Sequence, residues 1–130
     1  MADHNFDLVI LGSGSGGYAA ALRGAQLGMS VALIERDKLG GTCLHRGCIP
    51  TKALLHSAEV ADVTREAGAY GVNATFQSID MSAVNKYRDS IVEKLYKGLT
   101  GLVSSKNITF VSGEGRMTGP KTMTVNGENY

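Results

Sequence analysis

The spacing of apolar positions predicts a strand–helix–strand unit at the start of the chain. The apolar run Phe6–Leu11 is too short for a typical helix and stops at glycine, as buried strands do. The alanine-rich segment Tyr18–Leu27 favours a helix closed by Gly28, and Ser30–Ile34 is a second buried strand. These elements predict a βαβ unit with parallel strands and a right-handed crossover.

Two further helices are predicted in the middle of the chain. The segment Thr51–Ala67 has helical spacing, with Leu54, Ala58 and Ala61 on one face, whereas residues 68–79 are rich in turn residues with room for one short strand. Asp80 is placed to cap a longer helix. The apolar positions of that helix are Val84, Tyr87, Ile91, Leu95, Leu99 and Leu102.

The last part of the chain predicts strands. Apolar and polar residues alternate from Ile108 and again over Lys121–Val125. The pair Asn126-Gly127 is a strong hairpin signal. We therefore expect an antiparallel β-meander from Ile108 onward. The whole is an α/β fold with a parallel sheet, helices and this C-terminal meander. Because Glu128–Tyr130 starts a return strand, we expect residues 1–130 to be one domain at the N-terminal end of a longer protein.

Composition narrows the function classes. A length of 130 residues suits one domain, and 43% apolar residues is ordinary for a soluble protein. The net charge of +1 gives no reason to expect nucleic acid or an anionic membrane surface as a partner. No basic segment precedes the first apolar run, which is too short to span a bilayer. We expect no secretory signal, no membrane attachment and a cytoplasmic protein.

The segment between the first strand and helix carries a glycine motif. Gly12, Gly14 and Gly17 match G-x-G-x-x-G in its structural context. In that motif the first glycine permits the turn, the second admits a pyrophosphate and the third lets the helix pack on the strand. Free N–H groups of Ser15, Gly16 and Gly17 at the helix start would hold phosphate charge.

An acidic residue follows the second strand at the distance this motif requires. Glu35 lies 23 residues after Gly12, where its carboxylate can accept hydrogen bonds from both hydroxyls of an adenosine ribose and repel a 2′-phosphate. Strand, helix and acid together favour dinucleotide binding over a plain glycine turn with a surface glutamate. The motif does not separate FAD from NAD.

Cys43 and Cys48 are the only two cysteines, and they lie within the run GGTCLHRGCIPTKALL from Gly40 to Leu55. In a reducing compartment a close pair is more often catalytic or metal-binding than structural. Cys48 precedes a helix start that favours a thiolate, and Lys52 adds positive charge. Cys43, on the loop before, is expected to be the more accessible sulfur. A dithiol beside an adenosine-binding unit points to FAD, because a flavin can exchange two electrons with sulfur.

Three other interpretations of the cysteine pair stay open. The pair could be two reduced structural cysteines, half of a zinc site completed by His45 or His56, or a permanent disulfide. No second Cys/His pair lies elsewhere in the sequence, so a metal site is disfavoured. The compartment opposes a permanent disulfide, which would contribute only about 2 kcal/mol over so short a loop.

The run GGTCLHRGCIPTKALL closely resembles the redox-active segment of the pyridine nucleotide-disulfide oxidoreductases, and the resemblance extends over the whole chain. It is greatest to members that oxidise protein-bound dihydrolipoamide. The resemblance implies a Rossmann-like FAD-binding domain, FAD as cofactor and NAD⁺ as co-substrate. The implied partners are the lipoyl domain of a 2-oxo acid dehydrogenase complex and a second copy in a homodimer.

The resemblance also implies roles for individual residues. Cys43 would be the thiol that exchanges with substrate, and Cys48 the sulfur beside the flavin. Lys52 would approach flavin N5, and Gly115 would touch the adenine end through its main chain. The implied cofactor-binding set is Gly12, Gly14, Ser15, Gly16, Gly17, Glu35, Arg36, Gly40, Gly41, Thr42, Cys43, Lys52 and Gly115.

This sequence departs from the family pattern in two ways. His45 and Arg46 stand where Asn and Val are often found, and the 130 residues hold no second glycine fingerprint for NAD and no interface domain. We therefore expect these residues alone not to complete the reaction. Two alternatives stay open: the same chemistry on glutathione or mercuric ion, and a non-catalytic flavin-binding or redox-sensing module.

Overall fold

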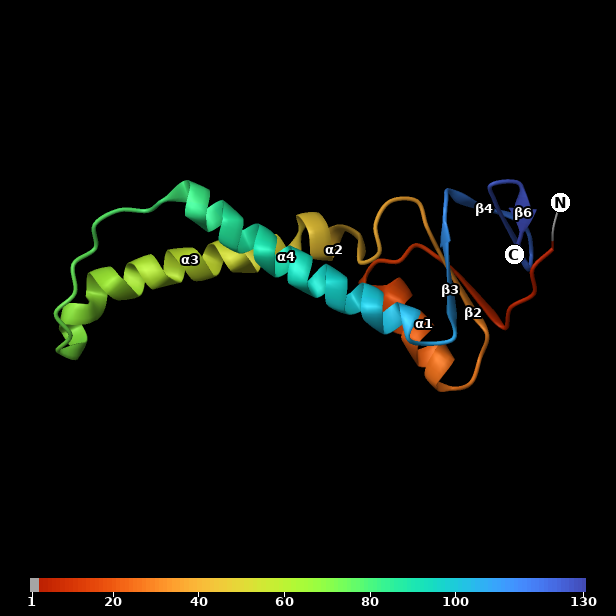
Figure 1. The fold of residues 1–130 in the computed structure, drawn as a ribbon, viewed down its shortest axis with the longest axis horizontal. Coiled ribbons are helices and arrows are strands. Elements are labelled where there is room, and N and C mark those ends of the chain that lie inside the picture. The colour runs from red at the N-terminus through yellow and green to blue at the C-terminus, as the bar shows by residue number, and fades with distance from the viewer. Residues whose placement is uncertain (1–2) are drawn as a thin grey trace.

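A parallel three-stranded sheet forms the middle of the structure, a computed structural model that describes residues 3–130. The strands β1 (Leu8–Leu11), β2 (Val31–Glu35) and β3 (Ile108–Ser112) lie in the order β1-β2-β3 (Figure 1). Leu8 and Ile108 both pair in register with Val31 of the central strand. Residues 31–34 are at most 1% exposed, because both faces of β2 are covered.

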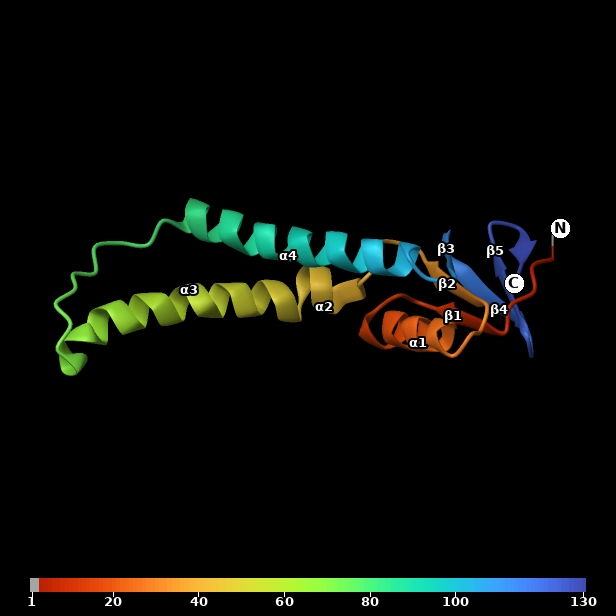
Figure 2. The ribbon, with the colours of Figure 1, turned by 60° about the horizontal axis from the view of Figure 1, so that its bottom comes forward.

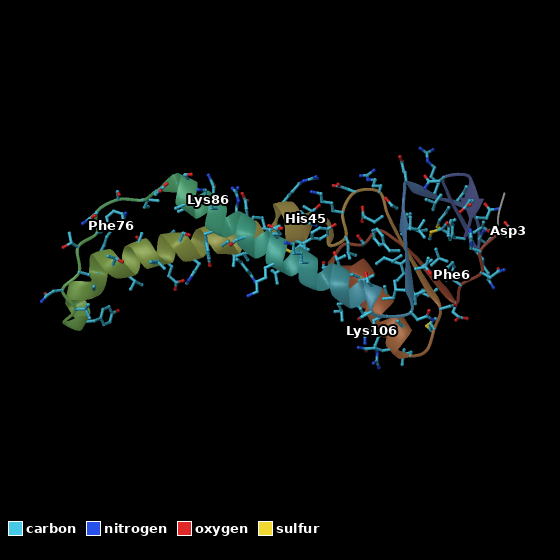
Figure 3. All side chains as sticks on the ribbon, viewed as in Figure 1. Asp3, Phe6, His45, Phe76, Lys86 and Lys106 are labelled. Atoms are coloured by element: carbon cyan, nitrogen blue, oxygen red, sulfur yellow. A yellow bond between two sulfur atoms is a disulfide. The ribbon has the colours of Figure 1, made fainter. Side chains whose placement is uncertain are left out.

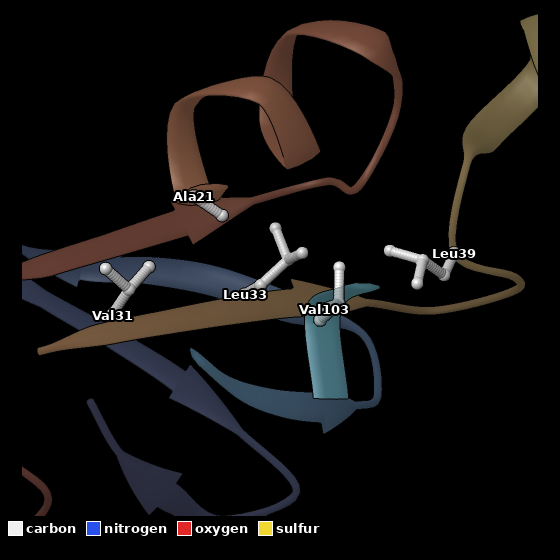
Figure 4. Packing of buried hydrophobic residues seen from close by; sticks show 5 residues of the cluster. All are labelled: Ala21, Val31, Leu33, Leu39 and Val103. Carbon is white, nitrogen blue, oxygen red and sulfur yellow. The ribbon is translucent and has the colours of Figure 1, made fainter. Parts of the chain in front are cut away.

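Helices cover one face of this sheet and a second sheet covers the other. Ala21 of α1 (Ser15–Gln26) and Val103 near the end of α4 (Met81–Ser104) pack with Val31 and Leu33, as Figure 4 shows. Ile34 points to the opposite face, because side chains alternate along a strand. There it meets the antiparallel meander of β4 (Gly115–Gly119), β5 (Thr122–Val125) and β6 (Glu128–Asn129).

The remaining helices form a long arm beside the sheet. The short helix α2 (Gly41–Arg46) leads into α3 (Cys48–Glu66), which ends in the 3₁₀ turn η1 (Ala67–Tyr70). Helix α3 runs away from the sheet and α4 runs back toward it, and the two lie side by side in both ribbon views (Figures 1 and 2). None of the helices within residues 3–130 is both long and apolar enough to cross a membrane.

The structure confirms the main sequence predictions. The first two strands and their helix form a parallel βαβ unit, and the meander is present over residues 115–129. Asp80 caps α4, since its Oδ1 accepts hydrogen bonds from the backbone N–H groups of Ser82 and Ala83 at 2.8 and 3.1 Å.

Three expectations were wrong. The strand at Ile108 belongs to the parallel sheet rather than the meander, because the α4 connection returns it beside β2. Helix α3 begins at Cys48, three residues before Thr51, and its buried face carries Ala53 and Ala61 while Leu54 is 38% exposed. Residues 72–80, all within the described chain, contain no strand.

Gly17 is predicted to be essential for the packing of α1 on β1. A Cβ at this position would overlap the carbonyl oxygen of Gly12. We expect Gly17→Ala to lower the free energy of unfolding by about 1–3 kcal/mol, the usual cost of overpacking. Urea denaturation measures this change.

The neighbouring Gly16→Ala is the matched control. The same added Cβ meets no atom of the described chain within 4 Å. Alanine is also the better helix former, so this variant should be neutral or up to about 1 kcal/mol more stable. Equal losses in both variants would contradict the packing argument.

Candidate functional site

The glycine motif forms the loop between β1 and α1. Gly12 has a φ of +92°, a left-handed conformation that glycine adopts without strain. Gly14 is the N-cap of α1, and no side chain in residues 3–130 caps this helix start. A Cβ on Gly14 would meet no described atom within 4 Å, so the space beside it is open. Exposed N–H groups and open space together suit a phosphate group.

The loop that carries the first cysteine lies directly against the glycine loop. The backbone N–H of Gly40 donates to the carbonyl oxygen of Ser13 at 3.0 Å. A Cβ on Gly41 would lie 2.7 Å from the Cα of Gly14, so only glycine permits this approach. Both loops follow strands of the parallel sheet, at the carboxyl edge where ligands of such sheets bind.

Cys43 and Cys48 are joined by a disulfide with 4.7 Å between their Cα atoms. Cys43 lies in the first turn of α2 rather than on a loop, and Cys48 is the first residue of α3. Helix N-termini stabilise thiolates, so both sulfurs would gain acidity in the reduced state. Cys48 is the exposed residue of the pair and Cys43 is half-buried, the reverse of the expected order.

Glu35 ends β2 and is tied to both of its neighbouring turns. Its Oε2 accepts hydrogen bonds from the backbone N–H of Ser13 at 2.8 Å and from the Ser13 hydroxyl at 2.7 Å. Its Oε1 accepts from the backbone N–H of Asp37 at 2.9 Å. A carboxylate has about four acceptor sites, so these three bonds leave about one for a ligand.

The same bonds set the acidity of Glu35. Burial raises the pKa of the carboxyl, but the hydrogen bonds from Ser13 and from the backbone N–H of Asp37 outweigh it. The pKa of Glu35 therefore lies below its ordinary value of 4.5. The group is held as an anion at neutral pH.

Two small cavities meet at Glu35. One of about 210 Å³ runs from Gly12 past Glu35 and Arg36 to Gly115. A second of about 140 Å³ includes Glu35, Arg36 and Thr42. A larger cavity, about 540 Å³, lies between α2, α3 and α4 and contains none of the predicted cofactor residues. A ligand that contacts the glycine loop and Glu35 belongs in the smaller cavities.

Most of the predicted cofactor residues are thus brought together. The glycine loop, Glu35, Arg36, Gly40 to Cys43 and Gly115 lie around one edge of the sheet. Gly115 has a packing role as well, since a Cβ there would lie 2.8 Å from Leu11 Cδ1. Lys52 stands apart on α3, exposed and four residues after Cys48. The N–H donors of the glycine loop fit the phosphates of an adenine dinucleotide, and the acceptor carboxylate of Glu35 fits its ribose.

The two histidines considered as zinc ligands have other contacts. His45 Nε2 lies 2.9 Å from the carbonyl oxygen of Leu39, and its ring packs edge-on against Tyr96 near the start of the arm (Figure 3). His56 pairs with Glu59 at 3.2 Å. Among the described residues, no group of three or more His, Cys, Asp or Glu side chains is arranged to hold a metal.

Ser13 is the residue that the sequence analysis missed. It is completely buried, and it contacts Glu35 and Gly40 at once. A small hydroxyl side chain inside a run of glycines, with an acid at the end of the next strand, was the available signal.

Comparison with known proteins agrees with this geometry. Residues 6–130 match the family model described as pyridine nucleotide-disulphide oxidoreductase. The chain belongs to this family. Similar proteins include dihydrolipoyl dehydrogenases of Bacillus subtilis, with 49% identity over 88% of this chain, and of Thermus scotoductus, with 43% identity over 96%. That of Chlamydia trachomatis is 45% identical over 95%.

This member of the pyridine nucleotide-disulphide oxidoreductase family spans about a quarter of the length of these curated relatives. The matched part covers 24% of the Bacillus subtilis protein and 27% of each of the other two. The family membership accounts for the joint presence of a glycine loop and a close disulfide.

Acid is predicted to weaken the fold through Glu35. Because the folded-state pKa is below 4.5, the ionised carboxylate contributes its full stability above pH 4.5 and loses it as the pH falls through the folded-state value. Glu35→Gln removes this contribution. The difference in unfolding free energy between wild type and variant should therefore shrink from about pH 7 to about pH 3, as measured by urea denaturation.

Glu114→Gln is the matched control, because Glu114 lines the same cavity but its closest cation, Arg116, is 3.6 Å away. The difference in unfolding free energy between wild type and Glu114→Gln should change little with pH. If it shrank as much as the difference for Glu35→Gln, charge in the cavity rather than the bonds to Glu35 would set the pH dependence.

Proposed function

We propose that this protein is an FAD-dependent disulfide oxidoreductase that oxidises protein-bound dihydrolipoamide with NAD⁺. The observation that carries the proposal is the Cys43–Cys48 disulfide at two helix starts, on a loop that lies against a dinucleotide-type glycine loop. Similar proteins are named dihydrolipoyl dehydrogenases, which supports the choice of substrate.

The proposed cofactor site uses the residues around the sheet edge. The N–H groups of Ser15, Gly16 and Gly17 would hold the pyrophosphate, with Gly12 and Gly14 giving it room. Glu35 would accept from the adenosine ribose, and Arg36 and Gly115 would border the adenine end. Gly40 to Cys43 would follow the cofactor toward the disulfide, where Lys52 would lie near the flavin. When bound, FAD supplies a two-electron acceptor next to Cys48.

The thiol chemistry follows from the positions of the two sulfurs. A substrate thiolate attacks Sγ of Cys43, which forms a mixed disulfide and releases Cys48 as a thiolate. The helix N–H groups and the positive charge of Lys52 stabilise that thiolate. The second substrate thiol then closes the substrate disulfide and gives its proton to Cys43. The substrate loses two electrons and the cysteine pair gains them.

The exposure of the two cysteines fits this assignment if a flavin covers Cys48. Cys48 is the more exposed residue in the chain by itself, so it offers a surface for a planar ring. Cys43 would then be the sulfur left open to substrate.

The setting of the protein belongs to the same proposal. Its partners would be the lipoyl domain of a 2-oxo acid dehydrogenase complex and a second copy in a homodimer. Residues 1–130 would be the FAD-binding domain at the N-terminal end of a longer protein. A reducing cytoplasm would suit a disulfide that must open in every turnover.

Replacing each cysteine should separate the two roles. On two-electron reduction of the purified protein we expect a flavin band with a long-wavelength charge-transfer shoulder. Cys48→Ser should abolish the shoulder and Cys43→Ser should keep it, while both remove oxidation of dihydrolipoamide. Loss of the shoulder only in Cys43→Ser would reverse the assigned roles, and absence of any flavin band would contradict the function.

Substrate identity is tested separately by kcat/KM. In the longer protein of which these residues would be the first part, dihydrolipoamide with NAD⁺ should be turned over at least about a hundredfold better than glutathione disulfide or mercuric ion with NADPH. This ratio corresponds to a difference of about 3 kcal/mol in transition-state stabilisation. A flavin-containing protein that prefers either of the latter would keep the chemistry and refute the substrate.

A further inference from the structure

We propose that Ser13 is a positioning residue that orients Glu35 so that the cofactor-binding carboxylate reads one hydroxyl of the adenosine ribose. This inference rests on the proposed FAD site. Ser13 itself would not touch the cofactor, because its side chain is completely buried behind the carboxylate that it binds.

The first step is the way Ser13 occupies one carboxylate oxygen. Its backbone N–H and its hydroxyl both donate to Oε2 of Glu35, at 2.8 and 2.7 Å. Both acceptor sites of that oxygen are thereby filled. Rotation of the carboxylate would break two charge-assisted bonds at once, so the side chain is held in one orientation.

The second step concerns the other oxygen. Oε1 accepts from the backbone N–H of Asp37 at 2.9 Å, which leaves it one acceptor site. Glu35 borders the cavity that reaches Gly12 and Gly115, so this site is available to a ligand there. A single acceptor can satisfy one ribose hydroxyl, and the neighbouring hydroxyl must find another partner.

The third step is the connection to the cysteine loop. The carbonyl oxygen of Ser13 accepts from the backbone N–H of Gly40 at 3.0 Å. Ser13, in the glycine loop, is therefore bonded both to Glu35 at the end of β2 and to Gly40 at the start of α2. Loss of its hydroxyl would remove one of the three bonds that orient the carboxylate, while the backbone bonds from Ser13 and Asp37 remain possible.

The chain contains a matched control for this arrangement. Ser30 donates both its backbone N–H and its hydroxyl to Oδ2 of Asp7, each at 2.8 Å. This pair repeats the bonding of Ser13 to Glu35 at the opposite end of β1 and β2. Ser30→Ala deletes an equivalent hydroxyl–carboxylate bond away from the candidate site.

The experiment measures the affinity of the apoprotein for FAD and for two analogues that lack either the 2′- or the 3′-hydroxyl of the adenosine ribose. In the wild type we expect one analogue to bind about tenfold more weakly than FAD and the other within about threefold. Ser13→Ala and Ser13→Gly should weaken FAD about tenfold and bring the two analogues within about threefold of each other. Ser13→Thr, which retains a hydroxyl, and Ser30→Ala should keep the wild-type pattern.

The outcomes separate this inference from the proposed function. If wild-type protein binds FAD but binds both analogues equally more weakly, the inference that Glu35 accepts from only one ribose hydroxyl is overturned. Equal weakening of FAD and both analogues in Ser13→Ala, with the difference between the analogues preserved, would show a purely structural serine. Wild-type protein that binds FAD no better than FMN, which lacks the adenosine, would refute the dinucleotide site and this inference with it.

Discussion

The close approach of two backbone loops at one edge of the parallel sheet is the constraint on which the site depends. A Cβ on Gly41 would lie 2.7 Å from the Cα of Gly14, so a side chain at position 41 would displace the glycine loop. The Ser13–Gly40 hydrogen bond holds the two loops in this register. Because one loop opens α1 and the other opens α2, two helix N-termini converge on the same space. The arrangement therefore leaves room for a dinucleotide and a disulfide at the same edge of the sheet.

The three layers behind this edge supply the rigidity. β2 is buried on both faces, with Leu33 toward the helices and Ile34 toward the meander. A strand held on both sides fixes the position of Glu35 at its end. Gly115 lets the meander approach Ile34 closely enough to close one wall of the cavity, so the second sheet contributes to the site as well as to the core.

Local patterns carried most of the prediction from sequence. The βαβ unit, the cap at Asp80, the turn at Gly12 and the close packing at Gly17 depend on residues near one another in the chain, and all were found. The partner of the strand at Ile108 was misjudged, because alternation indicates a strand but not the sheet that receives it. The Ser13–Glu35 bond spans 22 residues and needs the tertiary fold, as does the relative exposure of the two cysteines. On α3, Ala53 is buried in place of the predicted Leu54, because the sequence does not show which neighbour the helix packs against.

The strand order has a consequence for the redox pair. The chain leaves the sheet at the end of β2 and returns to it at β3, and the hydrogen bonds of those two parallel strands hold both ends of the excursion. The disulfide lies wholly inside this excursion and bridges a sequence separation of 5 residues. Opening it changes the connectivity of a short local ring and leaves every strand pairing in place. Opening and closing of the disulfide therefore require no part of the sheet to re-form.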